Sequence, residues 1–238
     1  MKIAGVDGCR AGWIVVTRDL EGRAPPTLDL VPRFADLLTP DGPDVIAVDM
    51  PIGLPERAGP GGRGAERAVR PLLGPRQSSV FSVPARSAVW CQDYGEACRA
   101  ALAASDPPRK VSKQAFHLFP KIREIDALMT PELEARVYEV HPEVAFWRLN
   151  DECPMALPKK VKSRANPAGL EERAELLARH GVDPAFLAQR PPRGAGRDDL
   201  IDACVNAVIA ARIAHGTATP FPGNFERDAK GLRMAIWA

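Results

Sequence analysis

Short apolar runs alternate with turn-forming residues along the N-terminal part of the chain. The runs at 2–7 and 13–17 flank a glycine-containing turn and predict a β-hairpin. A weaker strand is expected at 27–31 and a further one at 45–49, with a short helix near 33–38 between them. The predicted order of these elements is therefore β-β-β-α-β.

Helical spacing of apolar positions prevails in the rest of the chain. Candidate helices cover 65–73, 94–104, 119–129, 169–180 and 198–214, and another strand is expected at 136–140. Strands that alternate with helices predict an α/β layer architecture. Because the 238 residues are 45% apolar and show no internal shift in composition, we expect a single domain over 1–238, with a helical and loop insertion around 56–130.

Three of the expected strands end in a carboxylate, at Asp7, Asp49 and Glu139. Burying an acid at the end of an apolar strand is costly unless a cation compensates it. If these strands are parallel neighbours, aligning their apolar runs puts the three carboxylates in register at one edge of the sheet, where open α/β sheets usually bind ligands. Purely structural roles remain open for each acid, and Glu143 competes with Glu139.

A further group of acids opens the last predicted helix. Asp199 and Asp202 are three residues apart and therefore share one face of it. Aspartate is favoured at the N-cap of a helix, and Asp198 is the expected cap. Asp199 and Asp202 are then left to point at the same edge of the sheet as Asp7 and Asp49.

Converging carboxylates repel one another, and this raises their pKa values unless a cation neutralises them. Mg²⁺ and Mn²⁺ prefer oxygen ligands and leave positions for water and substrate phosphate. Two such ions promote phosphodiester cleavage by activating the attacking water and stabilising the leaving oxygen. The sequence thus predicts a site for Mg²⁺ or Mn²⁺, expected as two ions, with Asp7, Asp49, Glu139 and Asp202 as ligands and Asp199 as a supporting catalytic group.

Side chains suited to phosphate lie in segments expected near that edge. These substrate-binding candidates are Arg10, Arg76, Ser78, Ser79 and Arg86. A second basic stretch, at 159–164, includes Lys162 and suits a nucleic-acid backbone. Solvated loop charge is the alternative interpretation of all these cations.

Overall charge and cysteine content narrow the class of protein. With 32 basic and 30 acidic residues the net charge is +2, so a polyanion site has to be local. The 5 cysteines show no zinc or disulfide spacing, which favours a reducing cytoplasm. No apolar run is long enough for a secretion signal or a membrane span, and we expect a cytoplasmic protein without a membrane partner.

Several segments together resemble a known family. They read GVDGCRAGW at 5–13, VDMPIGLPE at 48–56, LLGPRQSSVFSVPAR at 72–86, EVHPE at 139–143 and RDDLIDACVNA at 197–207. In this order they look like the DUF429 family, which is described as predicted ribonuclease H-like nucleases. The resemblance implies an α/β ribonuclease H-like fold, a mixed five-stranded sheet in the order 3-2-1-4-5 with helices on both faces. It also implies that the first, fourth and fifth strands are parallel.

The resemblance to metal-dependent nucleases of this fold carries over to single residues. It places Asp7 on the first strand and Asp49 on the fourth. The D-x-x-D-A pattern of Asp199, Asp202 and Ala203 resembles that of Holliday-junction resolvases. One departure is the second acid, which lies on a helix in ribonuclease H itself, whereas the candidates here lie on strands.

The leading functional hypothesis is a divalent-metal-dependent phosphodiester hydrolase, a nuclease acting on DNA or RNA. Two alternatives stay open. One is phosphotransfer, because actin-like kinases use the same β-β-β-α-β half and Asp7-Gly8 with Arg10 resembles a degenerate phosphate loop. The other is a non-catalytic nucleic-acid-binding module that keeps the fold.

Overall fold

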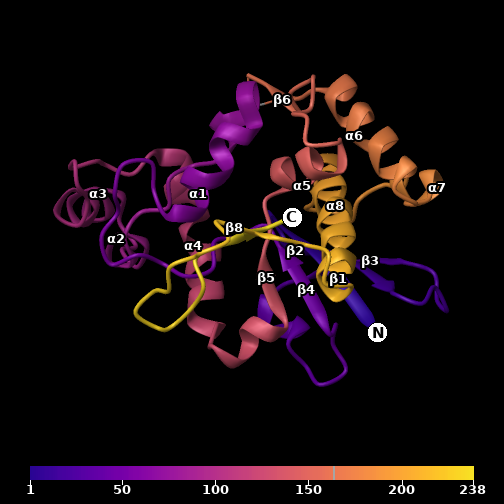
Figure 1. Cartoon of the computed structure of the whole chain (residues 1–238), viewed down its shortest axis with the longest axis horizontal. Coiled ribbons are helices and arrows are strands. Elements are labelled where there is room, and N and C mark those ends of the chain that lie inside the picture. Colours follow the sequence, from indigo (N-terminus) through magenta and orange to yellow (C-terminus); the bar gives the residue numbers. More distant parts are fainter. Residues whose placement is uncertain (163) are drawn as a thin grey trace.

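A five-stranded mixed sheet forms the centre of the computed structural model, which describes residues 1–162 and 164–238 (Figure 1). Its strands are β1 (Lys2–Cys9), β2 (Gly12–Asp19), β3 (Thr27–Val31), β4 (Val45–Val48) and β5 (Val137–Glu139). The order across the sheet is β3-β2-β1-β4-β5. Strands β1, β4 and β5 are parallel, while β2 is antiparallel to both its neighbours. The expected strand order and directions are confirmed.

Helices and two small ribbons complete the described fold. The α-helices are α1 (Gly64–Val69), α2 (Arg86–Val89), α3 (Tyr94–Ala103), α4 (Lys113–Leu128), α5 (Pro142–Leu149), α6 (Pro167–Arg179), α7 (Pro184–Leu187) and α8 (Arg197–Ala214). The 3₁₀ segments are η1 (Phe34–Leu37), η2 (Arg70–Ser79) and η3 (Glu132–Ala135). The ribbons pair β6 (Lys160–Val161) with β7 (Arg164–Ala165), and β8 (Pro220–Phe221) with β9 (Ile236–Trp237). Among the described residues no helix is long and apolar enough to cross a membrane.

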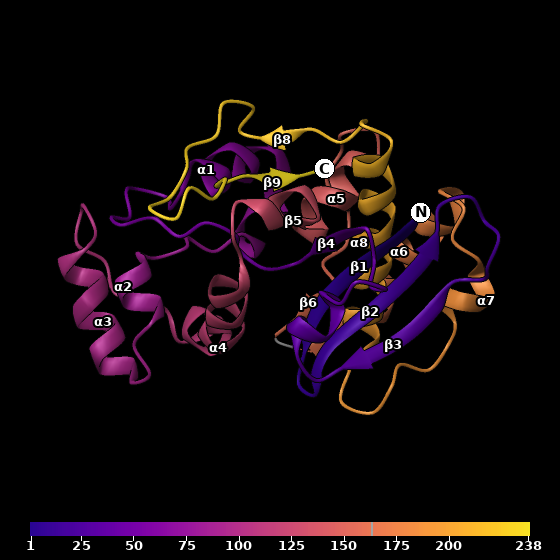
Figure 2. The ribbon, with the colours of Figure 1, turned by 90° about the horizontal axis from the view of Figure 1, so that it is seen from below.

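Both faces of the sheet are covered, because its strands alternate two sets of apolar side chains. Ile3 and Ala47 belong to a core shared with α5, α6 and α8. Ala4 and Val48 belong to a second core with η1 and α4 on the other face. Figures 1 and 2 both show α2, α3 and α4 gathered on one side of the molecule, away from α6 and α7. These three helices come from the long connection between β4 and β5, which covers the region expected as an insertion.

Helix α8 packs directly on the backbone of β1. A Cβ on Gly5 would lie 2.0 Å from the Ala207 nitrogen and 2.1 Å from the Ala203 oxygen, so this position requires glycine. One turn along, the Asn206 side chain donates a 2.9 Å hydrogen bond to the Val6 oxygen. The close approach fixes the start of α8 at the carboxyl end of β1.

Several helices differ from the expected ones. The short helices α2 and α7 were not predicted, and the helix expected at 65–73 is α-helical only to Val69. Helix α4 begins at Lys113 instead of residue 119, because Ser112 accepts a 3.1 Å hydrogen bond from the Ala115 nitrogen and caps it there. Helix α5 was missed. Its eight residues, almost all of them buried, are too few for the helical period to stand out in the sequence.

Candidate active site

Asp7 and Asp49 lie next to each other at the carboxyl ends of two adjacent parallel strands. The last paired residues of β1 and β4 are Val6 and Val48, and each aspartate comes directly after its valine. Asp7 is buried with 7% exposure and Asp49 is half-buried. The predicted register of these two acids is therefore confirmed.

The predicted register of Glu139 is wrong. Glu139 pairs with Val48, not with Asp49, so it stands one residue short of the two aspartates. A shift of one residue turns a side chain to the opposite face of a sheet. Glu139 accordingly lies on the same face as Val48, where Arg63 binds it, while Asp7 lies on the α8 face with Gly5.

Helix α8 brings two more carboxylates to Asp7 and Asp49. Asp202 is buried with 4% exposure, and its Oδ1 atom has no hydrogen-bond partner among the described residues. Asp199 is half-buried and lies one turn earlier on the same face of α8. We call Asp7, Asp49, Asp199 and Asp202 the acid cluster.

Burial and mutual repulsion disfavour ionisation throughout the acid cluster. Burial raises the pKa of Asp7 well above its ordinary range, and Asp49 and Asp202 add to the effect. Burial likewise raises the pKa of Asp49 to about 7; Lys159 opposes this shift and Asp202 adds to it. The pKa of Asp199 is raised to about 6, again chiefly by burial. The acids of the cluster therefore tend to keep their protons unless a cation compensates the negative charge of the ionised forms.

Lys159 is the cation closest to this charge. Its ammonium group donates a hydrogen bond to Asp202 Oδ2. Burial opposes the charged form of Lys159, yet Asp202, Glu143 and Asp49 raise its pKa above the ordinary value. Sequence reasoning placed Lys159 in a solvated or backbone-binding stretch and missed this role. No spacing in the sequence signals it.

Glu139 is held by protein partners. It accepts hydrogen bonds from Arg63 Nη1 at 3.0 Å and from the Ile52 nitrogen at 2.7 Å, and Arg63 Nη2 binds its other oxygen. Arg63 also pairs with Glu66 through Nε at 2.8 Å. Burial still raises the pKa of Glu139 to about 7, against the influence of Arg63. Both Glu139 oxygens thus have partners that a metal ion would have to displace.

Glu143, the alternative to Glu139, starts α5 and faces Lys159. Arg173 Nη2 binds its two oxygens at 2.7 and 2.9 Å. His141 lies close by, and burial lowers its pKa to about 4, with Lys159 adding to the shift. Its Nε2 atom is 3.3 Å from the Ser79 oxygen, and its buried Nδ1 atom has no partner in the described structure.

The start of α8 differs from expectation. Gly196 is the N-cap, and Asp199 Oδ2 accepts a 2.8 Å hydrogen bond from its nitrogen. Asp198, the expected cap, instead pairs with Lys160 at 2.7 Å. The assignment of Asp198 as the cap is therefore wrong. Asp199, at the third position of the helix, binds the backbone of the N-cap residue with one of its oxygens.

The structure places the predicted phosphate-binding residues in several separate parts of the molecule. Arg76, Ser78 and Ser79 lie on η2, and Arg76 Nη2 is 3.4 Å from the Ala156 oxygen, in the segment that leads to Lys159. Ser79 contacts His141 through its backbone oxygen. The structure therefore brings η2 beside the segments that carry Lys159 and His141.

The other candidates lie outside this neighbourhood or at its rim. Arg86, the first residue of α2, forms ion pairs with two carboxylates, Asp126 at 3.0 Å and Asp228. Arg10 is exposed in the turn that follows β1. Lys162 is exposed beside the β6–β7 turn, with a φ of 47°. Of these three residues, only Arg10 adjoins a strand that carries one of the acids.

The fit of a divalent ion rests on the acid cluster. No group of three or more histidine, cysteine, aspartate or glutamate side chains in the described chain is arranged to hold a metal ion as it stands. The orphaned Oδ1 of Asp202 and the raised pKa values of Asp7 and Asp49 nevertheless mark a place that lacks positive charge. The donor chemistry fits Mg²⁺ or Mn²⁺, provided that Lys159 gives up its contact with Asp202 or shares it.

Comparison with known proteins decides the family. The model of the family described as "Protein of unknown function (DUF429)" matches residues 5–227, nearly the whole chain. The chain belongs to the DUF429 family. No curated protein and no solved structure is significantly similar to it.

This DUF429 protein carries one basic feature that sequence reasoning missed. The loop before α8 exposes Arg190 and Arg193 and lines an open hollow of about 630 Å³. A Cβ on Gly194 would lie 2.4 Å from the Ala11 Cβ, so the loop lies against the turn after β1. The run of arginine, proline and glycine directly before a helix with three aspartates was the available signal.

Proposed function

We propose that this DUF429 protein is a divalent-metal-dependent phosphodiester hydrolase of ribonuclease H-like type that acts on nucleic acid. The observation that carries the proposal is the convergence of Asp7, Asp49 and Asp202. They come from two adjacent parallel strands and from the helix packed on them, and the pKa of each is raised chiefly by burial. Such a cluster is suited to a cation that brings a substrate phosphate with it.

Asp7, Asp49 and the free oxygen of Asp202 would hold Mg²⁺ or Mn²⁺. When bound, the ion supplies Lewis-acid activation of the scissile phosphate and of the attacking water. Asp199 lies beside the ligands, but one of its oxygens accepts a hydrogen bond from the Gly196 nitrogen. We therefore assign it a supporting role at the start of α8 and not a place among the metal ligands. Since Glu139 is bound by Arg63 and Asp202 by Lys159, the remaining oxygens suit one ion, and a second one requires Lys159 to withdraw.

Basic side chains flank this site on the side of β1. Arg10 lies in the turn after Asp7, and the loop with Arg190 and Arg193 lies against that turn. Arginine forks suit phosphate oxygens, and their exposure leaves them free to follow a backbone. We assign them to substrate phosphates that neighbour the scissile one.

The test combines metal binding with cleavage. Mn²⁺ is titrated into the wild-type protein, Asp7→Asn and the exposed control Asp29→Asn while the melting temperature is followed. The same proteins are then incubated with RNA, single-stranded DNA, duplex DNA and branched DNA. We expect Mn²⁺ to stabilise the wild type and Asp29→Asn but not Asp7→Asn, and cleavage to follow the same pattern. Equal stabilisation of all three proteins, or of none, contradicts the proposal.

One observation favours a non-catalytic nucleic-acid-binding module instead. Lys159 already neutralises part of the acid cluster without any metal. That alternative predicts nucleic-acid binding that survives Asp7→Asn and Asp49→Asn, with no cleavage of any substrate in Mn²⁺. The panel above therefore separates the two functions.

A further inference from the structure

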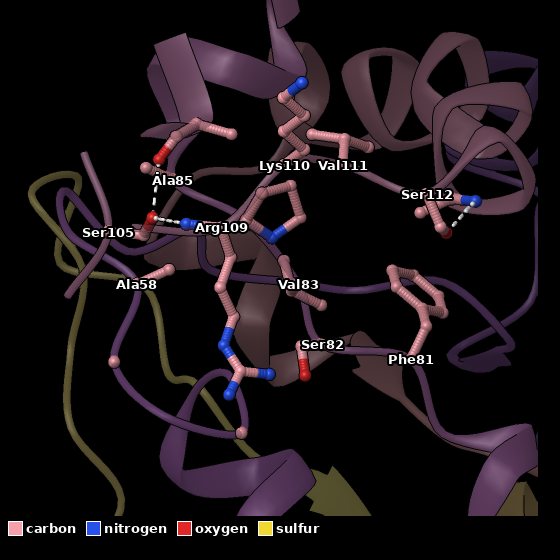
Figure 3. A pocket seen from close by; sticks show the side chains of 15 residues that line it. Ala58, Phe81, Ser82, Val83, Ala85, Ser105, Arg109, Lys110, Val111 and Ser112 are labelled. Atoms are coloured by element: carbon pink, nitrogen blue, oxygen red, sulfur yellow. Dashed lines mark hydrogen bonds between the residues drawn. The ribbon is translucent and has the colours of Figure 1, made fainter. Parts of the chain in front are cut away.

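A pocket of about 220 Å³ lies between the glycine-rich loop after β4 and the connection from α3 to α4 (Figure 3). Its wall is apolar, with Val83, Ala101 and Val111 buried in it and Phe81 partly exposed. Drug-sized ligands usually occupy roughly 300–1,000 Å³. The pocket is therefore sized for one planar ring system, not for a large ligand.

The mouth of this pocket is cationic. Arg109 and Lys110 are both exposed, and the pocket lining includes no carboxylate. Figure 3 shows the Arg109 side chain extending past Val83 toward Ser82. Within the described residues, no carboxylate oxygen lies close enough to the Arg109 guanidinium to form an ion pair. The Ser82 hydroxyl accepts a 3.3 Å hydrogen bond from Arg70 and keeps its own hydrogen for a ligand. Such a mouth attracts an anion.

Position connects the pocket with the acid cluster. Phe81 and Val83 line this pocket, and both also line a small cavity of about 30 Å³ that contains Asp49, Glu139 and His141. The segment 81–83 is therefore a shared wall between the pocket and the neighbourhood of Asp49. A chain-like ligand held in the pocket would continue toward the proposed hydrolytic site.

We propose that the pocket binds one unpaired nucleotide of the substrate strand, a role that rests on the proposed nuclease function. The base packs on Phe81 and the apolar wall, and Arg109, whose guanidinium lies on the side of Ser82, binds its phosphate. Stacking on an aromatic side chain tolerates any base, whereas the narrow pocket excludes a base that remains paired in a duplex. The substrate at this point is single-stranded, or is a branched or distorted nucleic acid that offers an unpaired base.

The first experiment measures binding without cleavage. A fluorescein-labelled 12-nucleotide single strand and the corresponding duplex are titrated against the protein in EDTA. Arg109→Glu and Phe81→Ala are compared with Lys113→Glu, an exposed lysine on α4 outside the pocket. We expect Arg109→Glu and Phe81→Ala to weaken single-strand binding about 5- to 150-fold, as for the loss of a stacked base at about 1–3 kcal/mol. Lys113→Glu should change it less than twofold.

Two outcomes overturn the inference. One is equal weakening by Arg109→Glu and Lys113→Glu, which would indicate unspecific attraction. The other is binding of the duplex as tightly as of the single strand. A second measurement distinguishes the contribution of the base from that of the phosphate. Cytidine monophosphate should raise the melting temperature of the wild type but not that of Arg109→Glu, and inorganic phosphate should raise the melting temperature of neither protein. Equal shifts with both compounds contradict a base pocket.

The two proposals fail separately. If Mn²⁺ stabilises wild type and Arg109→Glu alike and both cleave equally well, the nuclease stands and the pocket has no part in it. If strand binding depends on Arg109 while Mn²⁺ has no effect on the wild type, the pocket stands as a nucleotide site and the hydrolytic proposal fails.

Discussion

Lys159 donates a hydrogen bond from its ammonium group to the carboxylate of Asp202, which lies 43 residues further along the chain. The lysine comes from the connection between α5 and β6, and the aspartate from the first turns of α8. Asp202, Glu143 and Asp49 all raise the pKa of Lys159 against the effect of burial. The contact therefore substitutes one protein cation for part of the positive charge that the acid cluster needs.

Replacing this lysine should make the protein dependent on metal. We expect Lys159→Met to lower the free energy of unfolding by about 3–5 kcal/mol in EDTA at pH 8, because the buried Asp202 loses its counter-ion. Mn²⁺ should restore the stability, and calorimetry should find one ion bound per chain in the wild type and two in Lys159→Met. Thermal melts and calorimetric titration check this prediction.

The matched control is Lys160→Met. Lys160 is half-exposed and pairs with Asp198 outside the cluster. Exposed or half-exposed pairs contribute only about 0–1 kcal/mol, so this variant should respond to Mn²⁺ as the wild type does. If both variants respond alike, Lys159 does not compete with the ion.

The acid cluster also predicts how stability depends on pH. The pKa of Asp49 is raised from 3.8 to about 7, so the folded chain keeps a proton that the unfolded chain releases within that window. The free energy of unfolding then falls as pH rises from about 4 to 7, because the folded state binds more protons. The variant Asp49→Asn lacks this titrating group. As pH rises from 4.5 to 8, its free energy of unfolding should therefore increase relative to that of the wild type by on the order of 1–3 kcal/mol.

Thermal or urea unfolding at several pH values in EDTA measures this difference. Comparing the variant with the wild type cancels acids elsewhere whose pKa is lowered, such as Asp126 and Asp198. Mn²⁺ should abolish the difference at pH 8, since it favours the ionised carboxylates of the wild type. A wild type and variant with the same pH profile in EDTA would show that Asp49 ionises normally in the folded chain.

The sequence predicted the convergence of the acid cluster because that feature depends on local pattern. Asp7 and Asp49 each follow an apolar run that has to be a buried strand, and Asp199 and Asp202 share one face of a strongly apolar helix. The D-x-x-D spacing and the strand ends do not depend on long-range detail. Four of the five predicted catalytic acids therefore come together in the structure.

The predicted position of Glu139 is wrong because the register between strands is determined by tertiary contacts. Its apolar run aligns with those of Asp7 and Asp49 in sequence, but β5 pairs with β4 one residue out of that alignment. Nothing within the run encodes the offset, and a one-residue offset is enough to change the face. The ion pairs of Lys159 with Asp202 and of Arg63 with Glu139 could not be foreseen for a related reason: the partners lie in distant segments, and both basic residues occur in stretches of loop-like composition.

The basic loop before α8 should contribute to nucleic-acid binding through charge. We expect the double variant Arg190→Glu/Arg193→Glu to weaken binding of a single strand and to reduce the slope of log K against log salt by about 1–2, since each phosphate contact contributes roughly 0.7. Arg179→Glu, at the exposed end of α6, is the control. Fluorescence anisotropy measures strand binding by both variants and the wild type between 50 and 200 mM salt, a range over which the affinity of such contacts changes strongly. An unchanged slope in the double variant would remove these arginines from the substrate path.

The packing of α8 on β1 should determine whether the acids can act together. A Cβ on Gly5 would meet the backbone of Ala203 and Ala207 at about 2 Å, so Gly5→Ala has to push α8 away from the sheet and Asp202 away from Asp7. Overpacking of this kind costs about 1–3 kcal/mol or more. We expect Gly5→Ala to remain folded at low temperature but to lose most of its stabilisation by Mn²⁺. Gly223→Ala, where an added Cβ meets nothing within 4 Å, should keep it. Melting curves with and without Mn²⁺ decide the matter: a full Mn²⁺ response in Gly5→Ala would mean that the ion does not need Asp202 and Asp7 at their present separation.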